Sequence, residues 1–138
     1  NDIHNHVIIC GYTNLSKALI KKFKENNVPF IVLENSIEKR AELEEDYMTI
    51  HSVTFQKETF INARINHAKS VICAFESDSE NILTILTVKE VLEEIGNKKV
   101  KLISRIDYEE NIQKAEKLGV TNIVSPTTMA AASIYDII

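Results

Sequence analysis

The sequence predicts a doubly wound α/β fold, in which a parallel sheet of six strands carries helices on both faces. Short apolar runs rich in β-branched residues alternate with stretches whose apolar residues recur at helical spacing. The runs are apolar throughout, which is typical of strands that are buried on both faces of a parallel sheet. The strand order expected for this arrangement is 3-2-1-4-5-6.

The elements follow one another in a regular order along the chain. The β-branched runs predict strands at residues 6–10, 30–34, 48–51, 70–75, 100–106 and 122–125. The helical spacing predicts helices at residues 14–25, 36–46, 78–95 and 109–118, followed by a last helix from residue 126 onward.

Capping residues mark the ends of the predicted helices. Asp107 stands three residues before Glu110, which is the spacing of a capping box, so Asp107 is expected to cap the helix that follows it. Caps are also expected at Ser77, Gly96, Gly119 and the pair Ser125-Pro126.

The predicted helix at 78–95 has apolar residues on more than one stripe. One stripe can face the sheet. The second stripe is either covered by the rest of the domain or meets another subunit, and the pattern alone leaves both interpretations open.

Length and composition exclude several classes of protein. A chain of 138 residues has room for one domain, and its net charge of −4 without a basic run makes nucleic acid an unexpected partner. Cys10 and Cys73 each end an apolar run, as buried and reduced thiols do in a cytoplasmic protein. No run approaches the ~20 apolar residues of a membrane helix. Because the chain lacks an initial methionine and stops inside an apolar helical pattern, we expect residues 1–138 to be one domain of a longer protein.

The first predicted strand leads directly into a degenerate glycine loop. Of the G-x-G-x-x-G pattern that binds a dinucleotide only Gly11 remains, because Thr13 and Ser16 occupy the next two glycine positions. Thr13 places a β-branched side chain where the backbone would approach a pyrophosphate. Glu34 stands near the position, about 20 residues further on, at which a carboxylate receives ribose hydroxyls. Glu34 is either that carboxylate or an ordinary polar residue at a strand end.

Four segments of the chain resemble the RCK (TrkA-N) domain, which regulates potassium conductance in cytoplasmic parts of potassium channels and transporters. They are residues 5–12 (NHVIICGY), 28–34 (VPFIVLE), 68–72 (AKSVI) with 76–81 (ESDSEN), and 117–126 (KLGVTNIVSP). The resemblance covers essentially the whole chain in order, and it implies a Rossmann-like fold.

The resemblance also implies which residues surround a nucleotide cleft. They are Gly11, Tyr12, Thr13, Asn14, Leu15, Ser16, Glu34, Asn35, Ser52, Val53, Thr54, Phe75, Glu76 and Arg105. Nucleotide-binding members of the family carry G-x-G-R-x-G, and this chain lacks both the later glycines and the arginine. We therefore expect that no cofactor is required, that an adenine nucleotide (AMP, ADP or ATP) is an optional ligand, and that NAD fits less well.

No metal site is expected. Calcium-activated members of the family use acidic residues after the third and fifth strands, and the matching positions here are Val53, Arg105 and Asp107. One carboxylate beside an arginine does not supply the several oxygens that a hard cation needs.

The resemblance implies a gating-ring domain at the cytoplasmic face of the cell membrane. Such a domain couples ligand binding or domain assembly to a potassium pore in the same chain. It pairs with copies of itself through the helix at 78–95 and the helices beyond it. The alternative is a nucleotide-sensing regulatory subunit of a Trk/Ktr-type potassium transporter, although such subunits normally keep an intact glycine loop.

A small NAD-dependent oxidoreductase ranks last among the possible functions. The sequence holds no catalytic motif, so we expect no enzyme activity. The isolated histidines are expected to lie at the surface or to have hydrogen-bond partners, rather than to act as ligands or bases: His4, His6, His51 and His67.

Overall fold

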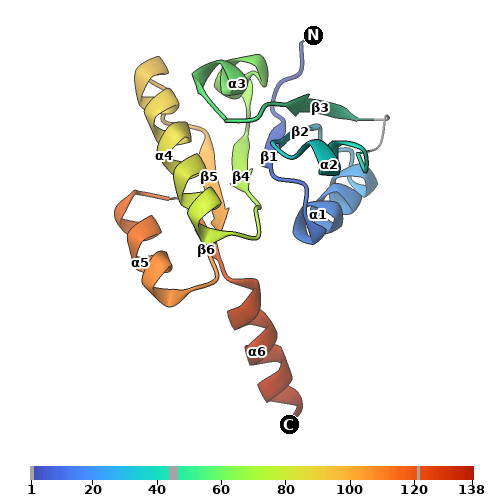
Figure 1. Cartoon of the computed structure of the whole chain (residues 1–138), viewed down its shortest axis with the longest axis vertical. Helices are drawn as coiled ribbons and strands as arrows, with labels where there is room; N and C mark the ends of the chain where they lie inside the picture. Colours follow the sequence, from blue (N-terminus) through green and yellow to red (C-terminus); the bar gives the residue numbers. More distant parts are fainter. Residues whose placement is uncertain (1, 44–46, 121) are drawn as a thin grey trace.

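The chain forms a sheet of six parallel strands in the order β3-β2-β1-β4-β5-β6 (Figure 1). The computed structural model describes residues 2–43, 47–120 and 122–138. The order and the parallel pairing confirm the predicted doubly wound fold, and the strand ends differ from the prediction by one or two residues. The strands are β1 (Val7–Cys10), β2 (Phe30–Glu34), β3 (Met48–His51), β4 (Ser70–Cys73), β5 (Lys101–Arg105) and β6 (Asn122–Val124).

Within the described residues the helices alternate with the strands. They are α1 (Asn14–Glu25), α2 (Ile37–Arg40), α3 (Lys57–Asn62), the 3-10 helix η1 (Ile65–His67), α4 (Asp78–Ile95), α5 (Glu109–Lys117) and α6 (Pro126–Ile137). The helix expected at 36–46 starts as predicted but is shorter, because α2 ends at Arg40; residues 44–46 of that prediction lie outside the described residues.

Two short helices, α3 and η1, are not among the elements predicted from the sequence. These short elements place Phe60, Ala63 and Ile65 in the core with no exposed surface. Three apolar positions within a polar stretch are too few to establish a helical period, so spacing alone does not reveal a helix of this length.

The two faces of the sheet carry separate apolar clusters. Residues alternate along each strand, so Ile8 and Cys10 of β1 pack with the cluster under α3, α4 and α5, whereas Val7 and Ile9 pack with the cluster under α1. Cys73 of β4 lies beside Cys10 in register, and both thiols are fully buried. Burial, together with the neighbouring Cys73, raises the pKa of the Cys10 thiol well above its ordinary value, so these thiols belong to the core.

Most of the expected caps are confirmed. The hydroxyl oxygens of Ser77 and Ser125 accept hydrogen bonds from the N–H groups of Glu80 and Thr128. Positive φ angles of 68° at Gly96 and 80° at Gly119 end α4 and α5.

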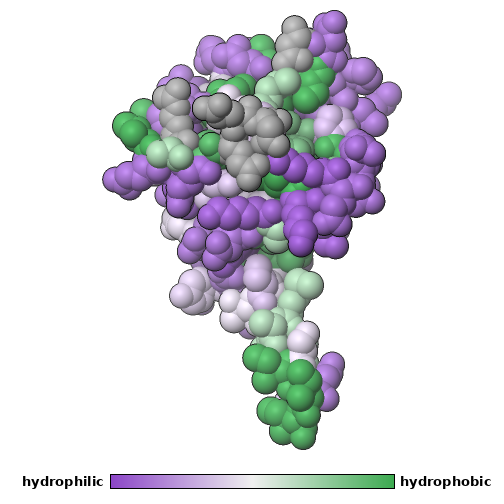
Figure 2. Space-filling view, turned by 90° about the vertical axis from the view of Figure 1, so that its right-hand side faces the viewer, coloured by the Kyte–Doolittle hydropathy of each residue, from purple (hydrophilic) through white to green (hydrophobic). Residues whose placement is uncertain are grey.

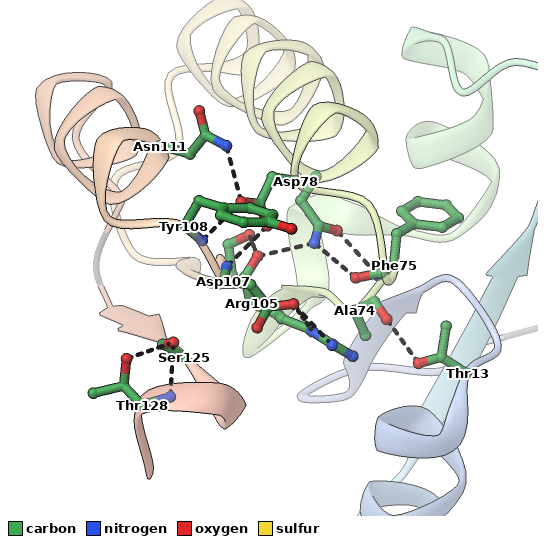
Figure 3. Close-up of polar contacts among 12 residues, drawn as sticks. Thr13, Ala74, Phe75, Asp78, Arg105, Asp107, Tyr108, Asn111, Ser125 and Thr128 are labelled. Carbon is green, nitrogen blue, oxygen red and sulfur yellow. Dashed lines mark hydrogen bonds and ion pairs between the residues drawn. The ribbon is translucent and has the colours of Figure 1, made fainter. Parts of the chain in front are cut away.

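The expected cap at Asp107 is wrong. Helix α5 has Tyr108 at its N-cap position, without a side-chain cap, and the Asp107 carboxylate pairs with the Arg105 guanidinium at 2.9 Å. The start of α5 is instead capped by Asp78 of α4. The Asp78 carboxylate accepts hydrogen bonds from the N–H groups of Asp107 (2.9 Å) and Tyr108 (3.0 Å) and from the side-chain amide of Asn111 (2.9 Å), as Figure 3 shows. A carboxylate 29 residues away in sequence therefore fixes α5 against α4.

Asp78 is held in its charged form. Burial alone raises the pKa of this carboxyl, but hydrogen bonds from Asn111, Asp107 and Tyr108 and the nearby Arg105 charge outweigh burial, so the pKa is lowered from its usual 3.8. The link between α4 and α5 is thus charge-assisted, which makes it stronger than a neutral contact.

Helices α4 and α6 each present more than one large apolar side chain to solvent. On α4, Leu83 and Leu86 are 65% and 44% exposed, so the described part of the domain does not cover the second apolar stripe. Helix α6 has no buried residue and extends away from the sheet (Figure 1). Figure 2 shows that its far end is apolar. The exposed large apolar residues of this segment are Met129 in the first turn and Ile134, Tyr135, Ile137 and Ile138 towards the far end.

His6 is buried just before β1. Its Nε2–H donates to the Ala63 carbonyl oxygen at 2.8 Å, and Nδ1 has no partner among the residues that the structure describes. Burial lowers the pKa of His6 below 6.5; the hydrogen bond to Ala63 opposes this shift, and the positive charges of Arg64, His67 and His4 add to it. Folding therefore favours the neutral ring.

The other histidines follow the expectation less uniformly. His4 and His67 are exposed, as expected. His51 at the end of β3 is half-buried, and its Nε2 has no partner within the described residues, so for His51 the expectation stays a prediction. In the sheet, His51 is in register with Glu34 of β2.

We expect the free energy of unfolding to decrease as the pH falls from about 7 to about 5, because the unfolded chain protonates His6 near its ordinary pKa while the folded chain resists it. The contribution is complete above that ordinary pKa and is lost as the pH falls towards the lowered pKa of the folded state. Urea unfolding at several pH values measures it. His6→Gln keeps a donor for Ala63 without titrating, so it should flatten the profile; an unchanged slope contradicts the assignment.

Candidate functional site

The candidate site lies where β1 and β4 part at the carboxyl edge of the sheet. The chain leaves β1 towards α1 on one face and leaves β4 towards α4 on the other. The two loops therefore diverge at the position where ligands usually bind in folds of this topology.

Gly11 makes the turn out of β1. Its φ of 97° lies in the region that side-chain-bearing residues rarely adopt, and a Cβ at this position would lie 2.8 Å from Cδ1 of Phe75. Both the backbone and the Phe75 ring thus require glycine. The expected tight turn is confirmed.

The next residues cap α1 with their own side chains. The Ser16 N–H donates to the Thr13 hydroxyl at 3.4 Å, the Thr13 N–H donates to the Ser16 hydroxyl at 3.1 Å, and the Ser16 hydroxyl donates to the Gly11 carbonyl. The Thr13 hydroxyl donates to the Ala74 carbonyl at 2.7 Å, which links the loop after β1 to the loop after β4 (Figure 3). The residues that replace the lost glycines therefore close the loop by hydrogen bonds.

Glu34 is part of the same closed network. Its side chain is 1% exposed; Oε1 accepts the Tyr12 N–H at 2.7 Å, and Oε2 accepts the Ser36 N–H at 2.6 Å. The carboxylate therefore holds the loop after β1 against the turn after β2.

A groove of about 270 Å³ opens beside this network. It contains four of the residues expected in the cleft, which are Asn35, Val53, Thr54 and Phe75. Five lining residues were missed by the sequence analysis: Phe55, Glu80, Leu83, Thr84 and Thr87. The spacing of Glu80, Thr84 and Thr87 is that of one helix face, which was the available signal for finding them.

The remaining expected residues lie outside the groove lining. Leu15 packs on the cluster of the opposite face, Asn14 and Glu76 are exposed, and the Ser52 hydroxyl donates to the Thr54 carbonyl at 2.7 Å. The Arg105 guanidinium is paired with Asp107 (Figure 3). Of the residues that the resemblance implies, four line the groove, and the assignment of the whole set to one ligand site stays a prediction.

The described residues restrict the chemistry of this site. Across residues 2–43, 47–120 and 122–138, no three His, Cys, Asp or Glu side chains are grouped closely enough to hold a metal ion. In the same ranges, no helix combines the length and the hydropathy needed to cross a bilayer. The groove offers the rings of two phenylalanines, threonine hydroxyl groups and the Glu80 carboxylate. These groups can bind a small organic ligand through ring contacts and hydrogen bonds.

The chain belongs to the TrkA-N domain family, whose model matches residues 7–126. A relative from Methanocaldococcus jannaschii named "Probable potassium channel protein 2" is 31% identical over 128 residues; the alignment covers 90% of this chain and 36% of that protein. This chain thus matches only about a third of the relative's length.

Solved structures show the same fold at lower identity. The TrkA-N domain of the Escherichia coli inner membrane protein ybaL has a TM-score of 0.85 and 21% identity, with 100% of this chain and 99% of that chain covered. GsuK bound to ADP has a TM-score of 0.76 and 21% identity, with coverage of 90% and 32%. At this identity the likeness concerns the fold alone.

Gly11→Ala should destabilise the domain by about 2 to 4 kcal/mol, since it combines a left-handed backbone with a clash against the Phe75 ring. Gly96→Ala is the matched control, because φ is also positive there but no atom lies within 4 Å of the added Cβ. That variant should lose about 1 to 2 kcal/mol. Urea unfolding compares the two, and equal losses would contradict the role of Phe75.

Proposed function

We propose that this domain regulates a potassium channel from the cytoplasmic face of the membrane, without catalysing a reaction. The observation that carries the proposal is the alignment of 90% of the chain with a relative named as a probable potassium channel protein. Under this proposal residues 1–138 are one domain of a longer chain that also holds the pore. The domain exists in two arrangements, and whatever binds one arrangement better shifts the pore towards it.

The exposed apolar residues of α4 and α6 support pairing with another copy of the domain. Leu83 and Leu86 on α4 and the apolar side chains of α6 face solvent, which is costly for a helix that has no partner. These are the helices through which, by the family resemblance, we expect copies of the domain to pair. Two copies joined in this way would convert a change in one domain into relative movement of the pair.

A regulatory subunit of a potassium transporter is the second candidate. The nucleotide-sensing form of that function depends on an open glycine loop, and Thr13 and Ser16 close this loop. That observation favours the channel. An oxidoreductase would additionally need a catalytic group in the groove, where Glu80 is the one charged side chain among the described lining residues.

We expect the 138-residue chain to sediment as a dimer or larger assembly at micromolar concentration. Ile134→Asp on α6 should weaken the association by about tenfold or more, because it places a charge in a buried apolar contact. Ala132→Asp, at an exposed position on the opposite face of α6, is the matched control and should leave the association unchanged. If the wild-type chain stays monomeric, the proposal that α4 and α6 form a pairing surface is contradicted.

The full-length gene product, reconstituted in liposomes, tests the function directly. We expect potassium flux from the wild-type protein, and a changed open fraction in Ile134→Asp but not in Ala132→Asp. Absence of potassium flux would overturn the channel proposal. If potassium flux requires a separate membrane protein, the transporter subunit is the correct function.

A further inference from the structure

The place where a nucleotide phosphate would bind is filled by the protein itself. In folds of this kind the loop after the first strand and the first turn of α1 offer N–H groups to phosphate. Here the N–H of Tyr12 donates to Glu34, and those of Thr13 and Ser16 donate to each other's hydroxyls. A phosphate would have to displace two buried side chains, Thr13 and Ser16, which are 3% and 0% exposed.

The charges around the cleft also disfavour a phosphate. The Glu34 carboxylate is buried beside the loop, and the Glu80 carboxylate lines the groove. Nearby cations are engaged elsewhere: Arg105 pairs with Asp107 at 2.9 Å, and Lys17 lies over the Tyr12 ring at 5.3 Å from its centroid. A phosphorylated ligand would therefore meet carboxylates without a cation in the described groove lining.

The groove itself suits a flat ring that carries N–H donors. The Phe55 and Phe75 rings lie 5.8 Å apart at one side, and Leu83 adds apolar surface. The hydroxyls of Thr84 and Thr87 donate to the carbonyls of residues 80 and 83 at 2.8 and 3.2 Å, so towards a ligand they retain acceptor capacity only. Together with the Glu80 carboxylate, these hydroxyls make the side of the groove formed by α4 rich in hydrogen-bond acceptors.

From these observations we propose that the groove binds an uncharged, amino-substituted heteroaromatic ligand of nucleoside size and selects against its phosphorylated forms. The proposal rests on the proposed regulatory function, for which this groove is the ligand site. The groove volume of about 270 Å³ accommodates one ring system with its substituent rather than a dinucleotide. The TrkA-N fold is retained, but its phosphate subsite has become a structural cap.

Calorimetric titration of the 138-residue chain with adenosine, AMP, ADP, ATP and NAD tests the selectivity. Adenosine should bind, and each phosphorylated compound should bind at least about tenfold more weakly. Binding of AMP or ADP as tight as that of adenosine overturns the proposal. Absence of adenosine binding overturns it as well, and it is the result expected if a second copy of the chain fills the groove.

Two variants separate the causes of the selectivity. Glu80→Gln should narrow the difference between adenosine and AMP, whereas Glu90→Gln, an exposed position on the same helix, should leave the difference unchanged. The double variant Thr13→Gly with Ser16→Gly should gain ADP binding at unchanged adenosine affinity. Its unfolding midpoint is measured alongside because it loses the α1 cap, and if it does not fold, the Glu80 comparison decides.

Failure of this proposal is distinguishable from failure of the proposed function. Potassium flux and its response to Ile134→Asp can be measured with no ligand added, so they test the channel function separately from what the groove binds. If potassium flux is intact and AMP binds tightly, only the proposed ligand selectivity of the groove is overturned. If potassium flux is absent, the proposed channel function is overturned.

Discussion

The hydrogen bond from the Thr13 hydroxyl to the Ala74 carbonyl is the contact on which the candidate site depends. It joins the loop after β1 to the loop after β4, at the point where the chain turns to opposite faces of the sheet. In a dinucleotide-binding domain the bound ligand lies at this junction. Here a side chain makes the connection without a ligand, so this part of the edge is ordered before any ligand arrives, which lowers the ordering cost of binding.

The buried acids extend this arrangement in both directions. Glu34 holds the loop after β1 to the turn after β2, and Asp78 holds α4 to the start of α5. Each carboxylate accepts hydrogen bonds from two backbone N–H groups, so its oxygens have partners in the interior. Helix α4 is consequently fixed at its first turn, and the groove has a wall of defined position.

Helix α4 connects the groove with the exposed apolar surface. Glu80, Thr84 and Thr87 line the groove, while Leu83 belongs both to the groove and to the stripe that it shares with Leu86. Under the proposed function, a ligand in the groove and a neighbouring domain would contact the same helix. Coupling between them then needs only that the ligand prefers one arrangement of the pair.

The sequence by itself determined the sheet, its strand order, most of the helix caps and the edge at which the site lies. Periodicity and glycine positions are local signals, and they are read without knowing the contacts. The tertiary structure alone decided that α3 and η1 exist, that Asp78 rather than Asp107 serves the start of α5, and that Phe55 and Glu80 share a groove with Phe75. These features depend on side chains far apart in the sequence. The conformation of the substituted glycine loop is likewise decided by the tertiary structure, because Thr13 donates a hydrogen bond to Ala74, 61 residues away. No local sequence pattern indicates this contact.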